Sequence, residues 1–207
     1  MKRILSLLAA TVLLASFAHA HFVWLERDDR GPAAFFGEWQ ARVRETEEGY
    51  LKLIASPRAF SSTGAPLQVT RGQDRLRIED APGDLRLTDT YLGEKGKQLS
   101  YYQARLGRTE TVAKLDLELV PQSAGSNRFT LFLRGTPLPA TDVTLYTSTG
   151  WNRTFRTDAA GVVEIETPWA GPAVIEVVHT ETMPGEKDGR AYETVRHVFS
   201  LSFAVGR

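Results

Sequence analysis

Three histidines carry the most distinctive chemistry that the sequence offers. The chain of 207 residues contains four histidines and no cysteine. Without cysteine, no thiolate is present as a nucleophile or as a metal ligand. Neutral imidazole is the commonest metal ligand among side chains. One histidine, His19, lies in a segment that we expect to be removed, which leaves His21, His179 and His197 as the candidate metal ligands.

The first 20 residues have the pattern of a secretory signal peptide. Lys2 and Arg3 precede the apolar run ILSLLAATVLLASF, and Ala18-His19-Ala20 supplies the small-x-small cleavage pattern. That run is shorter than the roughly 20 residues needed to span a bilayer. We therefore expect cleavage after Ala20 and export to the periplasm, with His21 as the first residue of the mature chain.

Cleavage at this position would give His21 a chemistry that no internal histidine has. Its free α-amino nitrogen and its ring Nδ1 can bind the same metal ion and close a six-membered chelate ring. Nitrogen-rich, tetragonal surroundings favour Cu(II) or Ni(II) over the oxygen-seeking Mg²⁺ and Ca²⁺. The sequence thus predicts a copper or nickel ion as the cofactor, held at one site.

The other two histidines are predicted to face each other across a hairpin. The segments AVIEVVHTETM and ETVRHVFSLSFAV flank the turn-rich PGEKDGRAY, and a symmetric register pairs Met183 with Glu193 and His179 with His197. Opposed residues have Cβ atoms about 4.5–5.5 Å apart, so two rings could share one ion. The alternative is that each histidine is a hydrogen-bonded core residue.

Four further side chains are weaker candidates around such an ion. Glu181 and Met183 share strand parity with His179 and could approach the metal. Trp24 and Tyr192 could support the ligands, although packing is the favoured interpretation for both.

Composition argues against several other functions. Removal of Lys2 and Arg3 leaves 23 basic against 25 acidic residues, so no basic surface for nucleic acid is expected. No second apolar segment approaches membrane length, which predicts no span in the mature chain. The phosphate-loop, dinucleotide, nucleophile-elbow and zinc-helix motifs are all missing from the sequence. A binding protein is therefore favoured over an enzyme.

Short runs of β-branched and aromatic residues between turn signals predict an all-β fold. Examples are FVWL, RLRIED, RFTLFLRG and DVTLYTS. The one expected helix lies within residues 38–56. We expect a β-rich N-terminal region over residues 21–114, packed on a C-terminal region over residues 115–207. Residues 115–180 resemble the immunoglobulin-like β-sandwich of carboxypeptidase-regulatory-like modules.

The two ends of the mature chain resemble the NikM-like family of periplasmic proteins. The resemblance lies in His21-Phe22-Val23-Trp24-Leu25, in Phe36-Gly37-Glu38 and above all in HTETMPGEKDGRAYETVRHVFSLSF. Members are labelled as a domain of unknown function or as components associated with nickel and cobalt uptake. The resemblance implies transition-metal handling by the three matching histidines, with a membrane metal transporter as the partner.

Two other functions remain open from the sequence. A copper-dependent oxidative enzyme can also begin with a chelating histidine, in the arrangement called a histidine brace. A metal-free adhesion or interaction module would keep His179 and His197 as core residues.

Overall fold

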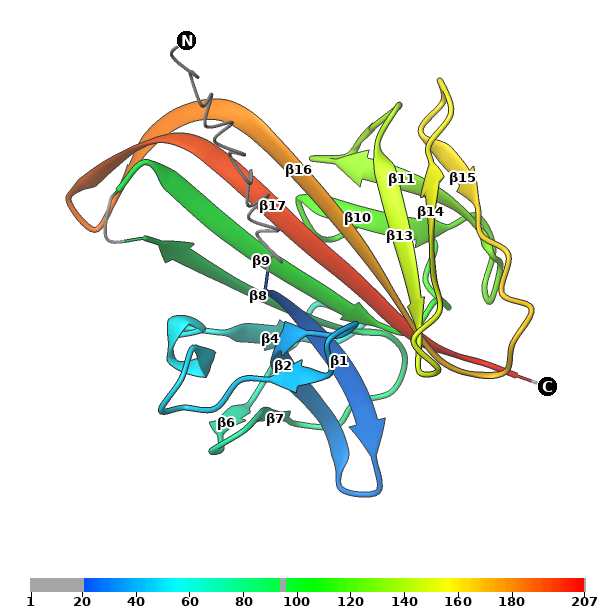
Figure 1. Ribbon diagram of the computed structural model, residues 1–207, viewed down its shortest axis with the longest axis horizontal. Coiled ribbons are helices and arrows are strands. Elements are labelled where there is room, and N and C mark those ends of the chain that lie inside the picture. Colours follow the sequence, from blue (N-terminus) through cyan, green and yellow to red (C-terminus); the bar gives the residue numbers. More distant parts are fainter. Residues whose placement is uncertain (1–20, 94–95, 207) are drawn as a thin grey trace, which may run out of the picture.

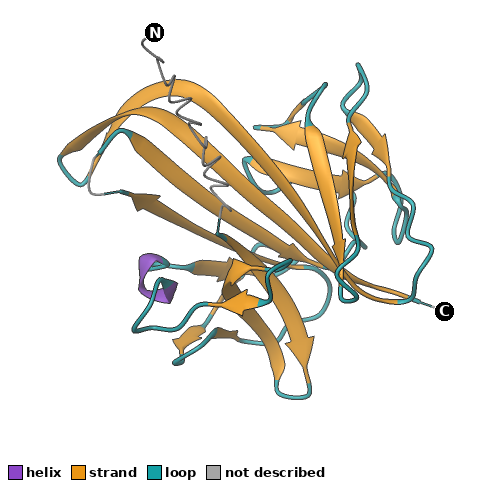
Figure 2. Cartoon of the chain, viewed as in Figure 1, coloured by secondary structure: helices purple, strands orange, loops and turns teal. Residues whose placement is uncertain are grey.

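The computed structural model describes residues 21–93 and 96–206, which form three β-sheets (Figures 1 and 2). The predicted signal peptide lies outside the described residues. The five-stranded sheet contains β1 (Phe22–Asp28), β2 (Gly31–Glu38), β3 (Val43–Arg44), β6 (Val69–Arg71) and β7 (Leu76–Ile78). The four-stranded sheet contains β10 (Leu117–Pro121), β11 (Arg128–Leu133), β12 (Thr136–Pro137) and β15 (Val162–Glu164).

The eight-stranded sheet is the centre of the molecule. Its strands, in spatial order, are β14 (Asn152–Arg156), β13 (Asp142–Thr147), β16 (Gly171–Lys187), β17 (Arg190–Val205), β9 (Gln98–Leu106), β8 (Leu85–Leu92), β4 (Arg58–Phe60) and β5 (Pro66–Leu67). β17 pairs in parallel with β9. The sheet therefore takes strands from both sides of residue 114, and the N-terminal and C-terminal regions share it.

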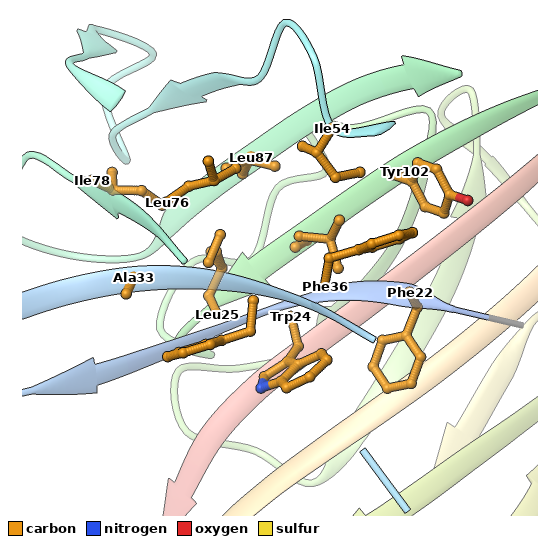
Figure 3. Packing of buried hydrophobic residues seen from close by; sticks show 14 of the residues in the cluster. Phe22, Trp24, Leu25, Ala33, Phe36, Ile54, Leu76, Ile78, Leu87 and Tyr102 are labelled. Carbon is orange, nitrogen blue, oxygen red and sulfur yellow. The ribbon is translucent and has the colours of Figure 1, made fainter. Parts of the chain in front are cut away.

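Each face of the eight-stranded sheet covers a separate apolar core. Tyr102 belongs to the cluster that contains Phe22, Trp24 and Phe36 of the five-stranded sheet (Figure 3). Val198 of β17 belongs to the same cluster. Phe199, Leu201 and Ile175 instead belong to the cluster shared with the four-stranded sheet. Neighbouring residues of a strand point to opposite faces of the sheet. The side chain of Val198 therefore lies in one core and that of Phe199 in the other.

A buried ionic cluster joins the two halves. Arg105 contacts Asp84 at 2.6 Å and Glu118 at 2.9 Å, and Arg86 contacts the same Glu118 oxygen at 2.8 Å. Both arginine side chains and Glu118 are fully buried. Because an unpaired buried charge is costly, these contacts fix the start of β10 against β8 and β9.

The all-β prediction is confirmed, whereas the helix expected within residues 38–56 is wrong. That segment holds β3, turns and only a short 3-10 helix, Leu51–Leu53, drawn in purple in Figure 2. The segment instead crosses the rim of the five-stranded sheet, where Glu45 N–H donates to the carbonyl of Phe36. No helix in the described part of the chain is long and apolar enough to span a membrane.

Candidate metal centre

The predicted pairing of His179 with His197 is confirmed. The two residues are direct partners in the antiparallel β16–β17 ladder, which places both rings on one face of the sheet. The predicted partnership of Met183 with Glu193 is wrong, because the register shifts between Thr182 and Gly185. The irregularity lies nearer the turn than the histidines, so their alignment is unaffected.

The His197 ring is part of a buried hydrogen-bond chain. Leu117 N–H donates to Gln103 Oε1, which turns the amide nitrogen of Gln103 toward His197 Nδ1 at 3.4 Å. His197 Nε2 lies 2.9 Å from Glu181 Oε1. The amide donates to Nδ1, so Nε2 carries the hydrogen and donates to Glu181. Both ring nitrogens of His197 are therefore engaged by protein groups.

Glu181 is held mainly by an arginine. Both of its oxygens accept from Arg134, at 2.6 and 2.7 Å. The Arg134 hydrogen bonds, with a further contribution from His197, lower the pKa of Glu181 to about 2. Burial lowers the pKa of the neighbouring His179, whose ring is partly buried. Glu181 lies beside His197, on the face of the sheet that strand alternation predicted. Its carboxylate there accepts hydrogen bonds from Arg134 and His197.

His21 lies against the opposite face of the eight-stranded sheet from His179 and His197, so the structure does not bring the three predicted ligands together, and their joint ligation of one ion stays a prediction. Its ring packs on Phe36, 5.4 Å between centroids, and Phe36 belongs to the core shared with Val198. His197 shares its face with Phe199, in the opposite core. The sheet separates His21 from His179 and His197 because strand alternation sends His197 away from β1.

Two carboxylates flank the His21 ring instead. Glu45 Oε1 lies 2.7 Å from Nε2, and Glu38 Oε1 lies 3.5 Å from Nδ1. Glu45 is itself positioned by Tyr50, whose N–H donates to Oε2 at 3.2 Å. The ring of Tyr50 meets the imidazole edge-on at 5.6 Å. The orientation of His21 is thus set by contacts on two ring atoms and one ring edge.

This arrangement leaves one ring nitrogen of His21 suited to a metal. Glu45 accepts a hydrogen bond from Nε2–H, so the neutral form of the ring has its lone pair on Nδ1. Nδ1 is the nitrogen that can chelate together with the α-amine, and Glu38 lies on this side of the ring. In residues 21–93 and 96–206, no group of three or more His, Asp or Glu side chains is placed to hold an ion. A metal here would need the terminal amine as a ligand.

Of the four weaker candidates, Glu181 contacts His197, whereas Trp24, Tyr192 and Met183 have other surroundings. Trp24 is buried and donates from Nε1 to Glu26 at 2.8 Å. Tyr192 covers Gly185 at the irregular end of the hairpin. Met183 is 43% exposed.

Sequence reasoning missed both Glu38 and Glu45. The β1–β2 ladder pairs Phe22 with Gly37, so one further step places His21 opposite Glu38. The same hairpin argument that paired His179 with His197 would have found Glu38. Its second strand was not expected, because GPAAFFGE begins with Gly and Pro and lacks β-branched residues.

Comparison with known proteins gives no family assignment, because no family model matches the chain and no curated protein matches it significantly.

Proposed function

We propose that the protein is a periplasmic transition-metal-binding protein that holds one copper or nickel ion at the mature N-terminus. The α-amine and Nδ1 of His21 would chelate the ion, and the Glu38 carboxylate would be a further ligand. The observation that carries the proposal is the pair of contacts on one ring: Glu45 at Nε2 and Glu38 beside Nδ1. A metal-binding histidine commonly donates its second ring N–H to a carboxylate.

Electrostatics support a cation at this position. Side chains of Glu38 and Glu45 are 19% and 16% exposed, and the His21 ring is 27% exposed. Two partly buried carboxylates beside the His21 ring favour the arrival of positive charge, since desolvation strengthens their attraction for it. Because these three side chains are still partly exposed, an ion can reach them from solvent.

The proposal assigns His179 and His197 a structural role. His197 has hydrogen-bond partners at both ring nitrogens, so recruiting it as a ligand would break the contact with Gln103 or Glu181. The set of three histidines that the sequence predicts, and that the family resemblance also implies, is therefore reduced in this proposal to His21. Association with metal uptake, with a membrane transporter as the partner, remains part of the proposal.

An immunoglobulin-like sandwich in the C-terminal half is also proposed. The four-stranded sheet and one face of the eight-stranded sheet share a core of Leu, Val, Ile and Phe side chains. Two sheets that bury one apolar layer between them are the basis of such a fold.

The test compares mature protein with a version that carries one glycine before His21. Intact-mass measurement first establishes the N-terminus, and calorimetric titration with Cu(II) and Ni(II) follows. We expect the extended form to bind at least about 100-fold more weakly, because its residue 21 nitrogen is an amide. Equal binding by the two forms would refute the proposal.

A copper-dependent oxidative enzyme is the second candidate, supported by the same N-terminal chelate. Oxygen-dependent turnover of a polysaccharide by the copper-loaded protein with an added reductant would favour it. A metal-free adhesion or interaction module, in which His179 and His197 are core residues, predicts no tight titration with either metal.

A further inference from the structure

A cavity of about 300 Å³ lies next to the His21 cluster. It shares Glu38 with that cluster, and it also contacts Phe22, the residue after His21. Its other walls come from the loop after β2 and from β13 and β16 of the large sheet. The cavity is thus a feature of the junction between two sheets, and the residues around His21 form only one side of it.

Aromatic rings form much of its wall. Phe22 and Tyr146 lie nearly parallel, with ring centroids 6.3 Å apart and an angle of 18° between planes. Trp39 also lines the cavity, and its Nε1–H donates to the carbonyl of Thr147 at 3.3 Å. That bond tethers the indole between the loop and β13. Aromatic faces carry negative potential and attract organic cations.

Two carboxylates, Glu38 and Glu176, also line the cavity. The Tyr146 hydroxyl donates to Oε2 of Glu176 at 3.0 Å, and no other hydrogen bond to this carboxylate is seen within the described residues. Burial raises the pKa of Glu176, while the hydrogen bond from Tyr146 and, to a smaller extent, the charge of Arg196 oppose this rise. A partly buried carboxylate with one uncommitted oxygen gains from a ligand that donates hydrogen bonds to it.

The lining is one-sided in charge. Among the described residues that line the cavity, two are acidic and none is lysine or arginine. An anionic ligand would meet both carboxylates with no lysine or arginine among these lining residues to pair with it. A bare metal ion would leave the aromatic walls without contact.

We propose that this cavity binds a small organic ammonium ion with an aromatic or short aliphatic body. The ammonium group would donate to Glu176 and Glu38, and the body would lie against Phe22, Trp39 and Tyr146. This inference goes beyond the proposed function and does not depend on it. Because Glu38 serves both sites, a metal at His21 should weaken binding of the organic cation, and the cation should weaken metal binding equally.

The test uses two probes of similar shape and opposite charge, phenethylammonium and 3-phenylpropanoate, titrated calorimetrically into mature, chelator-treated protein. We expect phenethylammonium to bind with a Kd below about 1 mM and 3-phenylpropanoate at least tenfold more weakly. Glu176→Gln should weaken phenethylammonium binding about tenfold. Glu166→Gln is the matched control, since Glu166 is exposed and pairs with Arg153 outside the cavity, and it should bind like the wild type.

Gln40→Arg provides a second variant at an exposed lining position. Its added positive charge should weaken the cation at least fivefold without disturbing a buried group. Equal binding of the two probes, no binding of phenethylammonium at millimolar concentration, or unchanged affinity in both Glu176→Gln and Gln40→Arg would overturn the proposal. Because these titrations contain no metal, their failure leaves the metal proposal standing.

Discussion

His21 and Glu45 are joined by a 2.7 Å contact between Nε2 and Oε1, although they lie 24 positions apart in the chain. Glu45 is fixed in turn by Tyr50 N–H and by its own backbone bond to Phe36. The carboxylate therefore orients the ring before any ligand arrives. A ring held in one tautomer loses less freedom on metal binding.

Removing the charge of Glu45 should weaken the metal site. In Glu45→Gln, we expect copper affinity of the mature protein to fall about 10- to 100-fold, the usual effect of losing the hydrogen-bond partner of a metal-bound histidine. Calorimetric titration with Cu(II) measures the change. Glu48→Gln is the control, since Glu48 is an exposed carboxylate three residues away, and it should leave the affinity unchanged.

Removing His179 should leave metal binding intact. We expect His179→Ala to bind Cu(II) within about twofold of the wild type, because the eight-stranded sheet separates this ring from His21. The same titration measures it, alongside His21→Ala as the positive control. A large loss in His179→Ala would instead return the histidine pair to the metal site.

The Arg134–Glu181 pair should make stability depend on pH. The pKa of Glu181 is about 2 in the fold, against an ordinary glutamate value of 4.5. A lowered pKa stabilises the folded state above pH 4.5, and this stabilisation disappears as the pH falls toward 2.

Arg134→Ala should consequently lose about 1 kcal/mol at pH 7, a modest value because Arg134 is 44% exposed and solvent screens the pair. Urea denaturation at a series of pH values measures the difference between variant and wild type. That difference should shrink steadily below pH 4.5. A constant difference down to pH 2.5 would show that lost packing, and not the ion pair, causes it.

Loss of Glu118 should be the most destabilising of these changes. Its side chain is fully buried between Arg86 and Arg105, so Glu118→Ala leaves two buried guanidinium groups short of a partner. We expect a loss of about 3–5 kcal/mol in the free energy of unfolding, measured by urea denaturation at pH 7. Glu164→Ala, at a 72% exposed side chain, should change stability by less than about 0.5 kcal/mol.

The sequence by itself determined the features that depend on local pattern. The alternation of apolar and polar residues, together with the turn residues, was enough to predict the all-β class and most strands of the C-terminal half. The symmetric spacing around Asp188 aligned His179 with His197, because a hairpin is a local structure whose register follows from its turn. The bulge beyond Thr182 displaced only the pairs nearer the turn.

Only the tertiary structure decided which of these residues lie together. The parallel pairing of β17 with β9 is non-local, and the stretch that contains β9 had no alternation strong enough to predict it. The packing of the whole chain likewise decides which face of the eight-stranded sheet β1 covers. That packing placed His21 beside Glu38 and Glu45, with the eight-stranded sheet between His21 and His197. Strand alternation fixes the face on which a side chain lies, but it does not determine which sheet covers that face.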